Sequence, residues 1–155
     1  MHWFKSALLC LALAACGFTP VYGPGGAGTQ LQNRVQVDRP IDRDGFLLVQ
    51  RLEERLGRAG DPAYTLAVDL NVGREARAID SDGDIRRFHM IGDATYTLTE
   101  MATGAVVRSD TVDNFVGYSA TGTTVATLAA QRDAQERLMT ILADEIVLQL
   151  QASAL

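Results

Sequence analysis

Residues 64–72, with the sequence YTLAVDLNV, alternate larger apolar side chains with threonine, alanine, aspartate and asparagine. Apolar residues occupy every second position from Tyr64 to Val72. Successive side chains of a β-strand point to opposite faces, so this period of two predicts a strand with one buried face. The opposite face, carrying threonine, aspartate and asparagine, is expected to meet water or a polar partner.

Two further strands are predicted on the C-terminal side of this one. A second alternation runs from Phe88 to Leu98, and a less regular third strand extends from about Val106 to Tyr118. The run Asp80–Asp84 contains an Asp-Gly pair that favours a tight hairpin turn, and Thr103-Gly104 marks the next turn. Short connections of this kind predict three antiparallel strands in a meander.

Two helices and a short strand are predicted around the meander. Arg34–Asp38 resembles a strand closed by Pro40, and Asp42 or Asp44 can then cap a helix. This first helix repeats leucine and valine at helical spacing and ends near Gly57 or Gly60. About residues 123–150 form a second, uninterrupted amphipathic helix. Its predicted apolar stripe consists of Leu138, Ile141, Leu142, Ile146 and Leu150.

The order strand-helix-strand-strand-strand-helix predicts the fold class α+β. A strand that returns through a helix pairs in parallel with its neighbour, whereas the meander is antiparallel. We therefore expect a two-layer sandwich, in which two helices pack on one face of a four-stranded mixed sheet. Residues 31–155 are expected to form this single α/β domain.

The N-terminus has the pattern of a secretory signal peptide over residues 1–15. Lys5 supplies a positive charge, and the apolar run Ala7–Ala15 is too short to span a bilayer. Leu13–Cys16 resembles a bacterial lipobox, which predicts cleavage before Cys16 and a covalent diacylglycerol and N-acyl chain on that cysteine. An ordinary signal with a chance cysteine is the alternative. Residues 16–30, rich in glycine and proline, are expected to be a lipidated flexible tether.

Composition excludes several function classes. The formal charge of −5 includes Lys5, so removal of the signal leaves −6, which disfavours nucleic-acid binding. His89 is the one histidine after the signal, and a solvated position on a sheet surface is its expected place. Asp80–Asp84 lacks the glycine and glutamate spacing of a calcium loop. We predict no catalytic residues, no bound metal and no cofactor beyond the acyl chains, and therefore no enzyme.

The opening of the predicted mature chain resembles a known family. Residues 16–23, Cys-Gly-Phe-Thr-Pro-Val-Tyr-Gly, are similar to the opening of the LPS-assembly lipoproteins of the LptE family, above all its alphaproteobacterial members. The resemblance implies a non-enzymatic subunit of the lipopolysaccharide translocon, which plugs the outer-membrane barrel LptD and helps it assemble. It implies contact with the membrane through the lipid anchor only. Gly17, after the cysteine, favours the outer membrane.

The family resemblance also implies that lipopolysaccharide can contact basic residues. Lipid A phosphates would be matched by arginine. Cross-strand ion pairing of these arginines with neighbouring carboxylates on a solvated hairpin is the alternative. The candidates near the first long hairpin are Arg74, Arg77, Arg86 and Arg87, and their acidic neighbours are Glu75, Asp80, Asp82 and Asp84.

Two other functions fit the sequence features. A periplasmic lipoprotein that binds or carries an amphiphile would need an enclosed apolar pocket of several hundred cubic ångströms. An accessory lipoprotein of another outer-membrane assembly machine would share the anchor and the fold. A barrel partner, or its absence, distinguishes these functions from the translocon subunit.

Overall fold

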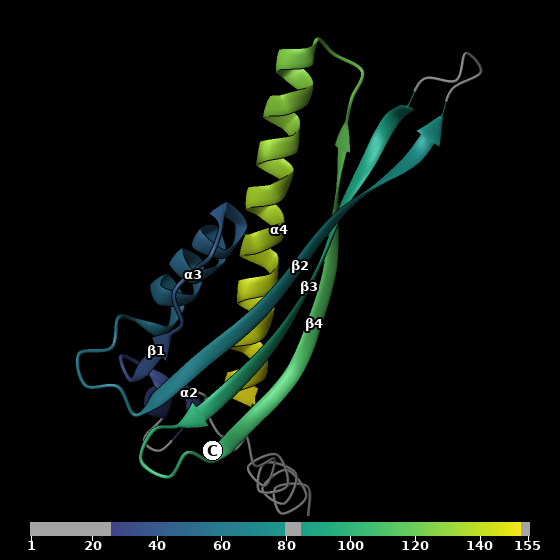
Figure 1. Ribbon diagram of the computed structural model, residues 1–155. Coiled ribbons are helices and arrows are strands. Elements are labelled where there is room, and N and C mark those ends of the chain that lie inside the picture. Colours follow the sequence, from purple (N-terminus) through teal and green to yellow (C-terminus); the bar gives the residue numbers. More distant parts are fainter. Residues whose placement is uncertain (1–25, 80–84, 153–155) are drawn as a thin grey trace, which may run out of the picture.

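The structure is a computed structural model that describes residues 26–79 and 85–152 (Figure 1). The predicted order of strands and helices is confirmed, with one short helix added at the start. In chain order the elements are α2 (Ala27–Leu31), β1 (Val35–Val37), α3 (Arg43–Leu56), β2 (Tyr64–Ile79), β3 (Ile85–Glu100), β4 (Val106–Ser119) and α4 (Thr124–Ala152).

The strands form one mixed sheet in the order β1-β2-β3-β4. β1 pairs with β2 in parallel, and the β2–β3 and β3–β4 pairs are antiparallel. The register sets Leu66 opposite Leu98 and Ala94 opposite Val112, so the apolar sets of the three long strands share one face. The predicted α+β fold with a four-stranded mixed sheet is therefore confirmed.

Local chemistry fixes both ends of α3. The backbone N–H of Gly45 donates to Oδ1 of Asp42 at 2.7 Å, which makes Asp42, rather than Asp44, the N-cap. Partial burial raises the pKa of Asp44, and the carboxylate of Asp42 adds to this rise. At the other end the backbone of Gly57 has φ 76°, a value that residues other than glycine rarely adopt.

Both long helices lie on the same side of the sheet, with α4 crossing β3 and β4 and with α3 beside it (Figure 1). The core fills the space between them. Because α4 lies close to the sheet at Gly92, a Cβ there would meet methyl groups of Leu138 and Leu142 at 3.1 Å. Residues from every layer are fully buried, among them Leu48, Leu52, Leu66, Tyr96, Leu98, Leu138, Leu142 and Ile146.

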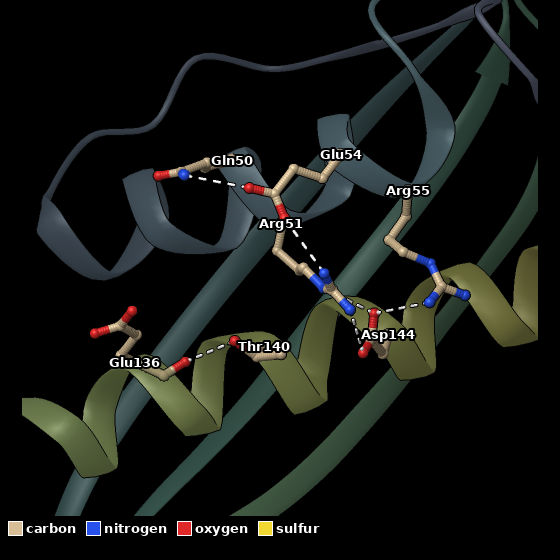
Figure 2. Close-up of polar contacts among 7 residues, drawn as sticks. All are labelled: Gln50, Arg51, Glu54, Arg55, Glu136, Thr140 and Asp144. Carbon is tan, nitrogen blue, oxygen red and sulfur yellow. Dashed lines mark hydrogen bonds and ion pairs between the residues drawn. The ribbon is translucent and has the colours of Figure 1, made fainter.

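An ion-pair cluster fastens α3 to α4 at the edge of this core (Figure 2). Arg51 donates through Nε and Nη2 to the two oxygens of Asp144, each at 3.0 Å. Arg55 approaches the same carboxylate at 3.7 Å, and Glu54 also accepts from Arg51. These hydrogen bonds raise the pKa of the Arg51 guanidinium further, first through Asp144 and then through Glu54.

We expect the substitution Asp144→Asn to lower the free energy of unfolding by about 1 kcal/mol, because a two-pronged arginine pair is lost at a site that is only partly exposed. Urea unfolding at low and high salt would measure it, and salt should reduce the difference. Asp133→Asn is the matched control, because Asp133 forms an exposed pair with Arg137 on the same helix. An equal loss in both variants would contradict a special role for Asp144.

The structure differs from the sequence-based expectation in three places. Residues 27–31 form α2 and bury Leu31 completely, although the sequence predicts a tether that extends to residue 30. β1 is shorter than the predicted strand, and β2 continues seven residues past Val72. The predicted turn at Asp80–Asp84 lies outside the described residues. In α4 the predicted apolar stripe is confirmed, since Leu138, Leu142, Ile146 and Leu150 are fully buried and Ile141 packs against the core. The N-terminal part of the helix is exposed, with Val125 at 78%.

Candidate functional site

Cys16, the predicted lipid acceptor, lies outside the described residues, so its acylation stays a prediction. Within the part of the chain that the structure describes, no helix is long and apolar enough to cross a bilayer.

The four candidate arginines lie in the distal half of the β2–β3 hairpin, but the strands direct them to different faces. Arg74 is opposite Met90 and shares the face that carries the core, whereas Arg87 is opposite Ser119 on the open face. Arg86 lies at a register shift between β2 and β3, and its carbonyl oxygen accepts from the N–H of Ala120 at 3.0 Å. The hairpin therefore does not gather the arginines into one cluster.

Arg77 is paired with a carboxylate. Its Nη2 lies 2.7 Å from Oε2 of Glu75, two residues earlier on the same strand. The register of β2 against β3 shifts between Ala76 and Ala78, at the position of Arg77. Arg77 is therefore ion-paired, but with a carboxylate of its own strand in place of the expected cross-strand partner.

An aromatic pair holds the distal hairpin to β4. The rings of Phe88 and Tyr118 stack with centroids 5.5 Å apart, and the guanidinium carbon of Arg74 lies 4.7 Å from the centroid of Phe88. Cation–π contacts of this length stabilise the arginine over the ring. This contact of Arg74, Phe88 and Tyr118 could not be identified from the sequence, because it depends on the register between the strands. The sequence does place Phe88 and Tyr118 in predicted strands, but it does not show that the two residues lie opposite each other.

The uncovered face of the sheet is polar, as predicted. Side-chain hydrogen bonds cross between neighbouring strands from Thr95 to Thr111 at 2.9 Å and from Thr97 to Ser109 at 3.0 Å. Asn71 donates to Asp93 at 3.0 Å on the same face. Cross-strand pairs of this kind stabilise the sheet and leave polar groups on its uncovered face.

His89 lies on this open face, as the sequence indicated. Its ring stacks on Phe115 with centroids 4.6 Å apart, and Phe115 is 56% exposed. No group of three or more histidine, cysteine, aspartate or glutamate residues in the described ranges could hold a metal ion. Stacking accounts for the position of His89.

Shifted pKa values in the described residues have structural causes. Burial raises the pKa of Tyr96, whose hydroxyl donates to Gln149 at 2.8 Å. The backbone N–H of Thr111, followed by Arg108, lowers the pKa of Asp110. Arg108 interacts with both Tyr96 and Asp110, so the three side chains form one hydrogen-bonded network on the sheet. The fold defines a small α+β domain with polar side chains on the uncovered face of its sheet.

Comparison with known proteins gives the particular family. The family model LptE, described as lipopolysaccharide-assembly, matches residues 30–150. The chain therefore belongs to the LptE family of lipopolysaccharide-assembly proteins, and the resemblance found at its N-terminus is confirmed. A search of curated protein sequences found no match.

Solved structures share the fold. A protein of Caulobacter crescentus CB15, described as a lipoprotein, is 30% identical with a TM-score of 0.67, and the match covers 81% of this chain and 92% of that one. The rare lipoprotein B of Shewanella oneidensis is 14% identical with a TM-score of 0.57, covering 75% and 89%. A minor lipoprotein of Acinetobacter baumannii is 18% identical with a TM-score of 0.55, covering 77% and 89%.

Proposed function

We propose that this family member is the lipoprotein subunit of an outer-membrane lipopolysaccharide translocon, in which it plugs an LptD-type barrel and helps it assemble. The observation that carries the proposal is the family match over residues 30–150. In this role the protein acts by binding its partner, and Cys16 supplies the lipid anchor at the inner leaflet of the outer membrane.

The open sheet face supports a location inside a barrel. The lumen of an outer-membrane barrel is polar, in contrast to its lipid-facing exterior. The rows formed by Thr95 with Thr111 and by Thr97 with Ser109 present hydroxyl groups that can bind such a wall directly or through water. A domain with this face and a separate apolar core fits a polar lumen without membrane-spanning segments.

The packing of the core gives less support to an amphiphile carrier. Such a carrier needs an enclosed apolar cavity of several hundred cubic ångströms. Between the sheet and α4, the Cα of Gly92 lies so close to Leu138 and Leu142 that even a methyl group would be in tight contact. The groove of about 580 Å³ in the described residues is open and lies on the outer side of α3, beside Phe46 and Glu53.

The proposal includes direct contact with lipopolysaccharide at individual arginines of the β2–β3 hairpin, and not at one site formed by all four. Arg74 and Arg87 lie on opposite faces of the hairpin, so they would not hold one phosphate together. Arg77 is already paired with Glu75 at 2.7 Å. A lipid A phosphate bound at Arg74 would therefore not be shared with Arg87, and further donors would come from the barrel.

A quantitative pull-down tests the partner. C-terminally tagged protein is recovered from detergent-solubilised outer membranes and its companions are quantified by mass spectrometry. We expect one large barrel at equal stoichiometry that persists through stringent washing. Recovery without a barrel would overturn the proposal, and lipid extraction of the same sample would then test the carrier function.

The anchor is tested by Cys16→Ala. We expect this variant to lack acyl chains and to leave the membrane fraction, because stable attachment takes two or more chains on the cysteine. Intact-mass measurement and fractionation would show both effects. Cys10→Ala is the matched control, since it changes a cysteine upstream of the predicted cleavage point and leaves Leu13–Cys16 intact. Membrane retention and normal acylation of the Cys16→Ala protein would exclude Cys16 as the lipid acceptor.

A further inference from the structure

The outer edge of β2 is mostly unpaired. β1 pairs with β2 only along Tyr64–Leu66, whereas β2 continues to Ile79. The carbonyl oxygen of Leu66 accepts from the N–H of Asp38 at 2.9 Å, so the backbone groups of Leu66 face the β1 side. The direction of backbone groups alternates along a strand. The N–H and C=O of every second residue from 68 to 72 therefore face the same side, beyond the end of β1 in the described sheet.

The edge formed by β4 is treated differently. The N–H of Thr111 donates to Oδ1 of Asp110 at 2.9 Å, and the N–H of Phe115 donates to Oδ1 of Asn114 at 2.8 Å. Both acceptors are held in place, Asp110 by Arg108 at 2.7 Å and Asn114 by Glu145 of α4 at 2.9 Å. Side chains thus accept hydrogen bonds from two backbone N–H groups on the β4 edge. These N–H groups are then less available to pair with another strand.

A groove with an apolar floor and a charged rim lies beside the open β2 edge. A depression of about 100 Å³ is lined by Val68 and Leu70 of β2 together with the β1–α3 connection, which also contributes charged residues, namely Asp38, Arg39 and Asp42. It shares Pro40 and Val49 with the larger groove on the outer side of α3, which Phe46 also lines. Phe46 is 58% exposed, and Ile41, in the same connection, is completely exposed. The open edge is therefore flanked by exposed apolar side chains, whose burial against a partner would be favourable.

We infer that the β2 edge at residues 68–72 and this groove take an extended segment of the protein partner, which adds to the sheet as a strand collinear with β1. Another extended backbone can form hydrogen bonds with a row of backbone N–H and C=O groups, whereas an acyl chain has no groups that could do so. The groove would take apolar side chains at alternate positions of the added strand. The inference rests on the proposed function, since the barrel subunit is the partner that supplies the segment.

A photo-crosslinking amino acid at Ile41, in the full-length lipoprotein produced in its own cells, tests this. The expected crosslink joins the barrel recovered in the pull-down and maps to one extended segment with apolar residues at alternate positions. The matched control carries the same probe at Leu148, which is 66% exposed on α4, and should give no crosslink to that segment.

The outcomes separate the inference from the proposed function. A barrel that co-purifies without an Ile41 crosslink overturns the strand addition and leaves the translocon subunit intact. A crosslink to a second copy of this chain, or crosslinks scattered over the barrel, also overturns it. Loss of the barrel itself from the pull-down would remove the proposed function and the inference with it.

A substitution in the groove provides an independent measurement. Phe46→Asp places a charge at an exposed site, so the isolated domain should unfold at the same denaturant concentration as before. The yield of the Ile41 crosslink should fall about tenfold, because a carboxylate opposes the burial of apolar side chains next to it. An unchanged yield in a folded Phe46→Asp protein would mean that the groove does not hold the segment.

Discussion

The substitution Leu142→Ala is expected to lower the free energy of unfolding by about 3 kcal/mol, within the range seen for fully buried leucines. Leu142 is 0% exposed, and one of its methyl groups lies where a Cβ on Gly92 would meet it at 3.1 Å. Around Leu142 the helix α4 packs against both α3 and the sheet, which limits its movement into the cavity, so we expect little of the loss to be recovered. Urea unfolding followed by circular dichroism would measure the difference.

Leu148→Ala is the control for this experiment because it makes the same chemical change on the same helix. Leu148 is 66% exposed, and its truncation should change the stability by less than about 0.5 kcal/mol. Helix propensity is altered equally in both variants, so the difference between them isolates burial. Equal losses in the two variants would contradict the position of the core between α4 and the sheet.

The second large effect is expected at Gly57, where alanine should cost at least about 2 kcal/mol. The residue ends α3 with φ 76° and ψ 157°, and its N–H donates to the carbonyl of Glu53 at 2.9 Å. A Cβ at this position would overlap Oδ1 of Asn33 and lie 3.1 Å from Nε2 of Gln32. Both backbone strain and a clash with the turn before β1 therefore oppose the substitution.

Thermal unfolding of Gly57→Ala beside Gly60→Ala would check this expectation. Gly60 is three residues away in the same connection, and a Cβ there would meet nothing within 4 Å. Alanine at Gly60 should be neutral or slightly stabilising, because it restricts the unfolded chain. A Gly57→Ala protein as stable as Gly60→Ala would show that the turn around Asn33 can rearrange freely.

The alternation of side chains makes the meander predictable. In Tyr64–Val72 and Phe88–Leu98 the period of two agrees with strand propensity and with nearby turn residues, so several local signals favour one structure. The parallel pairing of β1 with β2 follows from the helix between them. These signals are local or depend only on topology, which is why the amino-acid sequence suffices to predict the fold class.

Features that depend on distant residues cannot be derived in this way. α2 starts within a glycine-rich stretch and is stabilised by burial of Leu31, so local propensity gives no indication of it. The separation of Arg74 from Arg87 follows from strand register, and a count of charges cannot reveal it. The side-chain caps of Asp110 and Asn114 on the β4 edge also require knowledge of which strand lies at the edge.

The β2–β3 hairpin is long compared with the thickness of a bilayer. β2 and β3 each contain 16 residues, and at about 3.3 Å per residue each spans about 53 Å. The hydrocarbon core of a bilayer is only about 30 Å thick. In Figure 1, α2 lies near one end of the sheet, and the C-terminal end of β2 and the N-terminal end of β3 lie at the other. With the proposed lipid anchor at Cys16, upstream of α2, the far end of the hairpin can therefore lie farther from the attachment point than the thickness of the hydrocarbon layer.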